Sequence, residues 1–396
     1  MTAGRALGRI GATMLVLIAT LGAGSYATGT ARAHSTGVSG ALRALVEQDS
    51  LRPGPDSARV AKLLDAMAAT DRLACELVAD QMGNFWWDGD DDGLGAFSDA
   101  RAPLRVAKDS LRGHVRESRA ITLLVTRLSA DDPCVRRIAA KLLGRSAIPN
   151  DRLTALLDNS APRVREAAAY AIGEGDRHGA RSALESRLGG RDSSLAAMSA
   201  WALSELHDSA SVPALIRAAR SQVALVRLGV MRALGEIKDE GTVMEVERAV
   251  RDSHAGVRRA AVRALGELGL VRSSDVLAAA LADKDAEVRF AAASALGELH
   301  ELRRAPGALI RAAASTETRL AELAMHSLAE IKDPATLDVL VGALAHQNRE
   351  VRLSAVQALG EIRSAKAVPA LLRALKDPDP EVRRAAAEAL GEMREG

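Results

Sequence analysis

Apolar side chains recur at helical spacing through most of the chain, in runs separated by turn residues. In the last such unit, residues 366–394, the letters DPDP divide two runs, and Asp379 stands where it would cap the second run, with Pro380 at the first helical position. Each run keeps its apolar residues on one face: Val368, Leu371, Leu372 and Leu375 in the first, and Val382, Ala386, Ala389, Leu390 and Met393 in the second. The pattern predicts a pair of antiparallel helices.

The second run is repeated along the chain, as VRRAAVRALGEL from Val257, VRFAAASALGEL from Val288 and VRLSAVQALGEI from Val351. Its glutamates are 31 residues apart, with one step of 32, at Glu174, Glu205, Glu236, Glu267, Glu298, Glu330, Glu361 and Glu392. An earlier copy begins at Val135, which makes nine copies across residues 118–396. A helix pair of this length cannot bury its apolar stripe alone, so neighbouring copies must stack into a solenoid.

Composition agrees with thin, closely stacked helices. Of the 396 residues, 48% are hydrophobic but only 2% are aromatic. A core built from so few aromatic residues consists of small aliphatic side chains, which suit helices better than a sheet. We therefore expect an all-α fold, with an irregular helical cap over residues 34–117 ahead of the repeats.

The N-terminus reads as an export signal. Arg5 and Arg9 precede the apolar run IGATMLVLIATLGAG, and the letters ARA end at Ala33. We predict a signal peptide over residues 1–33, cleaved after Ala33, and export to the periplasm or beyond the cell. A permanent anchor is the alternative, but the run is shorter than the ~20 residues that span a bilayer.

The net charge limits the classes of partner that the protein can bind, and the cysteine content limits its redox chemistry. The full chain has a formal net charge of +2, and the mature chain, with 50 basic and 51 acidic residues, has −1. A near-neutral chain without a basic run is a poor candidate for binding nucleic acid. Export would permit Cys75 and Cys134 to pair. We favour two small buried residues in helices instead, because nothing in the sequence brings them together.

The repeated pattern D-x-(D/N)-x-x-V-R-x-x-A-x-x-A-L-G-E-(L/I) resembles the HEAT repeats, specifically the short type named after phycobilin lyase subunits. The resemblance covers about 70% of the chain. It implies a right-handed superhelix whose second helices line the concave side. The resemblance implies little about function, because proteins of unrelated roles share this repeat.

Position one of the second helix, counted from its valine as zero, is arginine in seven of nine copies: Arg136, Arg165, Arg227, Arg258, Arg289, Arg352 and Arg383. An anion-binding row is one interpretation. We favour a structural one, because an acid or amide precedes most of these arginines, and Asp–Arg pairs would tie successive repeats together. The glutamates are likewise interpreted as a solvated structural row, and the glycines before them as sites of close helix contact.

Positions two and six vary freely and share one helical face. Together they hold all three aromatic residues of the repeats, although bulky side chains would also have suited core positions. Aromatic residues and arginine are enriched in protein-binding hot spots. We predict a concave recognition strip formed by Tyr170, Trp201, Leu228, Arg232, Arg259, Arg263 and Phe290. The alternative is that Tyr170 and Trp201 only fill gaps left by irregular copies.

The segment FWWDGDDDGLGAFSD, residues 85–99, interrupts this regularity. Asp88, Asp90, Asp92, Gly93 and Asp99 have the spacing of an EF-hand loop, and the final Asp resembles the calcium loops of dockerin modules. The positions of Gly95 and Ala96 argue against calcium. We favour a cap in which the four aromatic side chains of this segment cover the open end of the first regular repeat.

Two enzyme families share the repeat. Deoxyhypusine hydroxylases hold two irons with His-Glu pairs just after the Val-Arg, and no copy here has a histidine there. The histidines, including His326 at position six of its second helix, are interpreted as isolated polar residues. Phycobilin lyases act on a pigment protein in the cytoplasm, which the signal peptide contradicts.

The sequence therefore favours a non-catalytic, exported scaffold, without cofactor or metal, that binds a protein or extended peptide. It would be a monomer or weakly self-associating, and would not span a membrane once cleaved. An accessory enzyme subunit of the lyase type and a calcium-tuned envelope component are the alternatives.

Overall fold

The computed structural model describes residues 55–68, 75, 114–299 and 301–394, all within one compact unit, Gly54–Gly396. Over these residues the regular structure is entirely helical, with 19 α-helices and no strand. The predicted signal peptide, residues 1–33, and the acidic segment, residues 85–99, lie outside the described residues. Cleavage after Ala33, calcium binding, the aromatic cap and the extent of the cap region therefore stay predictions.

Nine helix pairs follow one another from Ser118, which confirms the predicted solenoid of nine repeats over the described residues. The first helices are α6 Ser118–Arg127, α8 Asn150–Ala155, α10 Arg181–Arg187, α12 Val212–Ala218, α14 Val243–Ala249, α16 Ser274–Ala280, α18 Gly307–Ala313, α20 Leu337–Ala343 and α22 Val368–Ala374. The second helices are α7 Pro133–Gly144, α9 Pro162–Glu174, α11 Ser193–Glu205, α13 Ala224–Ile237, α15 Ala255–Leu268, α17 Ala286–Gly297, α19 Thr318–Ile331, α21 Arg349–Ile362 and α23 Pro380–Arg394.

Short 3₁₀ helices complete the regular structure of the described residues. One extends α8, and most others lead directly into a first helix: η3 Leu156–Asp158, η4 His178–Ala180, η5 Ser209–Ser211, η6 Glu240–Thr242, η7 Val271–Ser273, η8 Pro334–Thr336 and η9 Ala365–Ala367. One more α-helix, α3 Ser57–Met67, precedes the repeats and packs against α6 and α7.

The second helices begin where the sequence predicts. The carboxylate of Asp379 accepts the backbone N–H of Glu381 at 2.9 Å, and Pro380 is the first residue of α23, as expected. Asp192 and Asp285 cap α11 and α17 in the same way. A cap of this kind satisfies N–H groups that have no partner inside the helix, so each Asp fixes the residue at which its helix starts.

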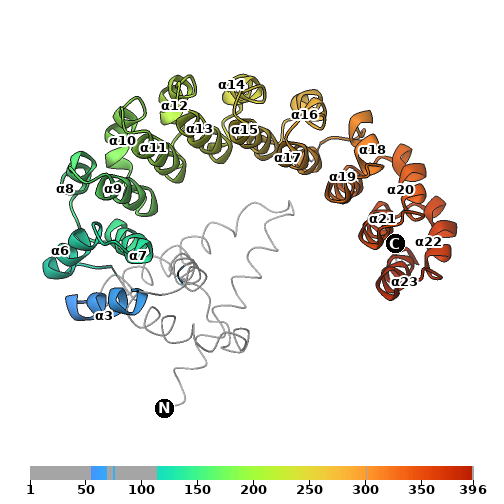
Figure 1. Cartoon of the computed structure of the whole chain (residues 1–396), viewed down its shortest axis with the longest axis horizontal. Coiled ribbons are helices and arrows are strands. Elements are labelled where there is room, and N and C mark those ends of the chain that lie inside the picture. Colours follow the sequence, from blue (N-terminus) through green and yellow to red (C-terminus); the bar gives the residue numbers. More distant parts are fainter. Residues whose placement is uncertain (1–54, 69–74, 76–113, 300, 395–396) are drawn as a thin grey trace, which may run out of the picture. The chain divides into compact units, whose positions relative to one another are not determined.

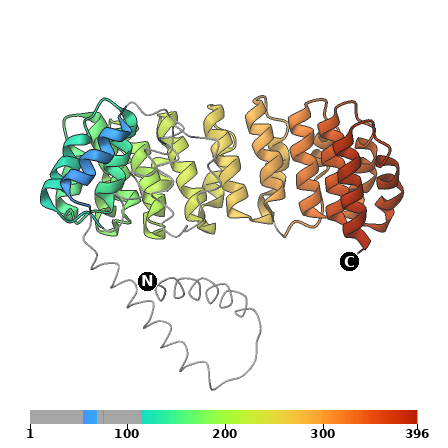
Figure 2. The ribbon, with the colours of Figure 1, turned by 90° about the horizontal axis from the view of Figure 1, so that it is seen from below.

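The two kinds of helix form two rows. Each second helix packs against its own first helix and against the second helices of the neighbouring repeats. In Figure 1 the first helices follow the outer side of the array and the second helices its inner side, and Figure 2 shows the helices standing side by side. Small residues permit this close packing: a Cβ on Gly235 would lie 2.9 Å from the Cα of Ala264. The predicted glycine contacts are therefore present.

The arginines of position one tie successive repeats together. Arg258 donates from Nε and Nη2 to the carboxylate of Asp283 at 2.8 Å each, and from Nη1 to the Asp252 carbonyl at 3.0 Å. The same arrangement joins Arg165 to Asp192, Arg227 to Asp252, Arg289 to Glu317 and Arg352 to Asp377. The structural interpretation of this column is thus confirmed for these five arginines.

The cysteine prediction is wrong in one respect. Both residues are buried, as expected, but Cys75 and Cys134 form a disulfide, with their Cα atoms 5.8 Å apart and 59 residues between them in sequence. Cys134 lies in the first turn of α7, against which α3 packs. That contact brings the chain after α3 to the start of α7, and nothing in the spacing of the two cysteines reveals it.

Candidate partner-binding surface

All seven residues of the predicted recognition strip lie on the second helices of five successive repeats, α9, α11, α13, α15 and α17. These helices pack side by side along the inner row. Arg232 and Arg263 are exposed, and the other five are half-buried: Tyr170, Trp201, Leu228, Arg259 and Phe290. The variable columns therefore form one row of accessible side chains that crosses five helices without interruption.

The two aromatic residues at the start of the strip are in contact. The rings of Tyr170 and Trp201 stack with their centroids 4.8 Å apart. The Tyr170 hydroxyl donates to Glu174 at 2.7 Å, and Glu174 pairs with the buried Lys141 at 3.1 Å. Burial raises the pKa of Tyr170 to about 12, with Arg137 opposing this change and Glu174 adding to it. The pair therefore contributes to packing between α9 and α11, while part of each side chain stays exposed.

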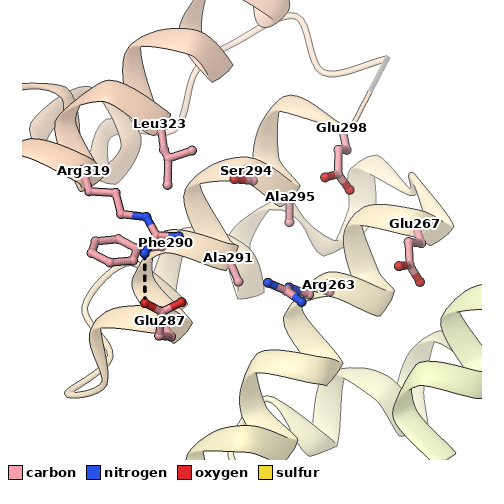
Figure 3. Close-up of a pocket in the computed structure, with 10 residues that line it drawn as sticks. All are labelled: Arg263, Glu267, Glu287, Phe290, Ala291, Ser294, Ala295, Glu298, Arg319 and Leu323. Atoms are coloured by element: carbon pink, nitrogen blue, oxygen red, sulfur yellow. Dashed lines mark hydrogen bonds and ion pairs between the residues drawn. The ribbon is translucent and has the colours of Figure 1, made fainter. Parts of the chain in front are cut away.

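A hollow of about 320 Å³ lies beside Phe290, at the other end of the strip (Figure 3). Residues of α15, α17 and α19 line it. The Arg319 guanidinium lies 4.7 Å from the centroid of the Phe290 ring and is held by Glu287, with Nη1 and Oε1 3.0 Å apart. Arg263 lines the hollow from α15. The hollow thus combines one aromatic face with two arginines and three carboxylates, those of Glu267, Glu287 and Glu298.

The arginines of the strip differ in their pairing. Arg259 approaches Glu287, with Nη1 and Oε2 3.9 Å apart. Arg232 and Arg263 make no hydrogen bond or ion pair with any residue in the described part of the chain. The side chain of Leu228 approaches the backbone of Gly256 in the next repeat. Contacts are thus concentrated at the stacked Tyr170–Trp201 pair and around Phe290.

Glu287 and Arg319 also belong to this surface, although the two variable columns do not include them. Both occupy the position just before the valine position of their helices, seven residues before column six and therefore on the same helical face. The same column holds Leu225 in the fourth repeat, which is 44% exposed. The signal was available, because a face defined by positions two and six also includes position minus one. The accessible surface is therefore wider than the two predicted columns.

The glutamate row lies along the edge of this surface. The pKa of Glu267 is raised, first by burial and then by repulsion from Glu236 and Glu298. At one place the row meets a histidine: in the described residues a single group of three potential metal ligands is found, His326, Glu330 and Glu361, whose ligand atoms all lie within 4.8 Å of one another. His326, interpreted from the sequence as an isolated polar residue, thus lies beside two carboxylates of this row.

Comparison with protein families decides the classification. The sequence model described as HEAT repeats matches residues 121–204, 150–233, 212–297 and 341–395, which together exceed half of the chain. The chain belongs to the HEAT-repeat family. The predicted resemblance is thereby confirmed, as is the fold class of a helical solenoid.

Solved structures resemble this member of the HEAT-repeat family at low identity. An engineered protein is 21% identical, with a TM-score of 0.44, over 85% of this chain and 99% of its own. Escherichia coli YibA is 18% identical, with a TM-score of 0.49, over 66% of this chain and 96% of its own. The CpcE–CpcF complex of phycocyanin lyase from Nostoc is 19% identical, with a TM-score of 0.38, over 63% and 94%. Curated protein sequences contain no match.

No helix within the described ranges has the length and apolar character needed to cross a membrane.

Proposed function

We propose that this HEAT-repeat protein is a non-catalytic scaffold that binds a protein or an extended peptide along the recognition strip, outside the cytoplasm. The observation that carries the proposal is the state of Arg232 and Arg263. On the same helices, Arg227 and Arg258 are committed to carboxylates of the next repeat. Arg232 and Arg263 are exposed and lack such a partner in the described residues, so their guanidinium groups are available to a ligand.

Helix spacing defines the chemistry of the partner. Packed helices lie about 8–10 Å apart, and an extended peptide in the polyproline II conformation advances about 3.1 Å per residue with three residues per turn, so one repeat corresponds to one turn of about three peptide residues. Arg232 and Arg263 occupy the same position in adjacent repeats. They therefore suit two acidic side chains three positions apart. One repeat further on, the hollow beside Phe290 suits an apolar side chain, again three positions along the peptide.

A peptide library displayed on phage tests this proposal against the mature chain. We expect enrichment of sequences with two acidic residues three positions apart, followed at the same interval by an apolar residue. The double variant Arg232→Ala, Arg263→Ala should bind the selected peptide at least about tenfold more weakly, which corresponds to about 1.4 kcal/mol.

The matched control is the double variant Arg217→Ala, Arg311→Ala, which removes two exposed arginines from the outer helices α12 and α18. It removes the same net charge and should retain the affinity of the unmodified chain. Equal losses in both double variants would show a general charge effect and contradict a binding site on the strip. Enrichment without the acidic spacing would contradict the proposed partner chemistry.

The location outside the cytoplasm has two supports. The N-terminal sequence has the organisation of a signal peptide, and the Cys75–Cys134 disulfide is of a kind that persists in oxidising compartments. Fractionation of the native cells followed by N-terminal sequencing tests it. We expect a chain that begins at His34 in an extracytoplasmic fraction, and a cytosolic chain that retains residues 1–33 would contradict the proposal.

A further inference from the structure

His326, Glu330 and Glu361 converge from two neighbouring second helices. His326 and Glu330 are four residues apart on α19, so they share one face of that helix, and Glu361 approaches from α21. One imidazole nitrogen and two carboxylate oxygens lie within 4.8 Å of one another. All three side chains are exposed and make no hydrogen bond or ion pair with other residues in the described part of the chain. Two unpaired carboxylates this close repel each other unless a cation lies between them.

This arrangement differs from the rest of the glutamate row. In the first, fourth and fifth repeats, column six carries a cation, Lys141, Arg232 or Arg263. In the seventh repeat the same position holds His326, whose ring nitrogens are potential metal ligands. The group is therefore more than an acidic cluster, because its donor set contains nitrogen and two of its members form a one-turn chelate on a single helix.

Two other glutamates of the row lie over a glycine of the preceding repeat: a Cβ on Gly235 would collide with the Glu267 carboxylate, and one on Gly266 with the carboxylate of Glu298. The repeat before Glu361 has Ala329 at the equivalent position. The carboxylate of Glu361 lies beside His326 and Glu330.

We propose that His326, Glu330 and Glu361 form a binding site for one divalent transition-metal ion of the Zn²⁺ type. One nitrogen and two oxygen donors suit Zn²⁺, whereas Ca²⁺ and Mg²⁺ prefer ligand sets made of oxygen alone. With three protein ligands, the remaining coordination positions of the ion face solvent and are open to water. The ion would join the seventh repeat to the eighth. The site does not depend on the proposed peptide binding.

Isothermal titration of the mature chain, purified without a histidine tag, with Zn²⁺ tests the proposal. We expect a saturable site that excess Ca²⁺ does not displace. His326→Arg gives this repeat the residue that the fifth repeat carries at Arg263, so the fold should tolerate it. It should weaken Zn²⁺ binding by more than about tenfold, since the loss even of outer contacts to metal ligands costs about 10–100-fold.

The control is Glu236→Gln, which removes an exposed glutamate of the same row in the fourth repeat and should leave binding unchanged. His326→Gln replaces His326→Arg if circular dichroism shows that the latter does not fold. Unchanged Zn²⁺ affinity in the folded His326 variant would overturn the site, as would equal loss in Glu236→Gln.

Discussion

Arg258 and Arg263 lie on the same helix, α15, five residues apart, and their surroundings are opposite. Arg258 is 5% exposed and is held by the Asp283 carboxylate and by backbone carbonyls of its own turn. Arg263 is exposed and has no ion-pair partner in the described residues. The contrast extends along the array, where five position-one arginines join successive repeats and the strip arginines Arg232 and Arg263 do not. Position on the helix, and not residue type, therefore decides whether an arginine serves the fold or is available to a ligand.

The difference also has an energetic basis. Removal of an arginine that is buried beside a carboxylate leaves that carboxylate as an uncompensated buried charge. An exposed arginine is already solvated, so its removal changes the free energy of unfolding little. The position-one residues are therefore expected to be sensitive to substitution and the strip residues tolerant of it.

The largest effect is expected for Arg258→Ala. Loss of this side chain leaves Asp283 largely buried without its cation, which should lower the stability around the fifth and sixth repeats by about 3 kcal/mol. Arg263→Ala should change stability by less than about 0.5 kcal/mol. Urea unfolding combined with hydrogen exchange of α15 and α17 measures both. Similar losses in the two variants would remove the distinction between the two arginine columns.

A smaller effect is expected for Trp201→Ala, because its side chain is half-buried and stacked on Tyr170. We expect a loss of about 2 kcal/mol, and a fall in the pKa of Tyr170 from about 12 toward its ordinary value of 10.0 as burial decreases. Thermal unfolding and absorbance titration of the tyrosinate measure these changes. Trp201→Phe keeps an aromatic face and is the control. An unchanged Tyr170 pKa in Trp201→Ala would show that the stacked pair is not what buries the phenol.

The smallest effect is a pH dependence. The hydrogen-bonded guanidinium of Arg258 holds the pKa of Asp283 below its ordinary value of 3.8, and Arg227 and Arg352 do the same for Asp252 and Asp377. A depressed folded-state pKa gives stability that is complete above the ordinary value and is lost as pH falls through the lower one. We therefore expect the urea midpoint to fall on acidification below about pH 4. Arg258→Ala should show a smaller fall, and an equal fall would contradict this origin.

The fold was predictable because the information is local. Valine, alanine and leucine at helical spacing, Asp-Pro at the helix starts and a period of 31 residues determine each helix pair and require its neighbours. The Cys75–Cys134 disulfide was not predictable, because it depends on how α3 packs against α7. That packing connects an irregular segment to a regular one, and no repeated pattern describes it.

The sequence predicted which helix positions of the candidate site are accessible, but not which residues of different repeats contact one another. Variation at positions two and six identified accessible side chains such as Arg232 and Arg263, since the fold does not dictate them. Contacts between columns of different repeats were not visible. The stacking of Tyr170 on Trp201 requires the offset between α9 and α11, and the group around His326 combines residues of α19 and α21. Such contacts arise from the spatial offset of adjacent copies.

The arginine–carboxylate connection runs from five of the repeats to the one that follows, and it uses equivalent atoms at Arg227, Arg258 and Arg352. A gene duplication or deletion that adds or removes one such whole unit therefore leaves the neighbouring connections intact. The array can change length in evolution by whole units, while a shift of a few residues would break a connection. Each added unit would also bring a new pair of variable columns, so the length of the ligand that the surface accommodates can evolve together with the length of the protein.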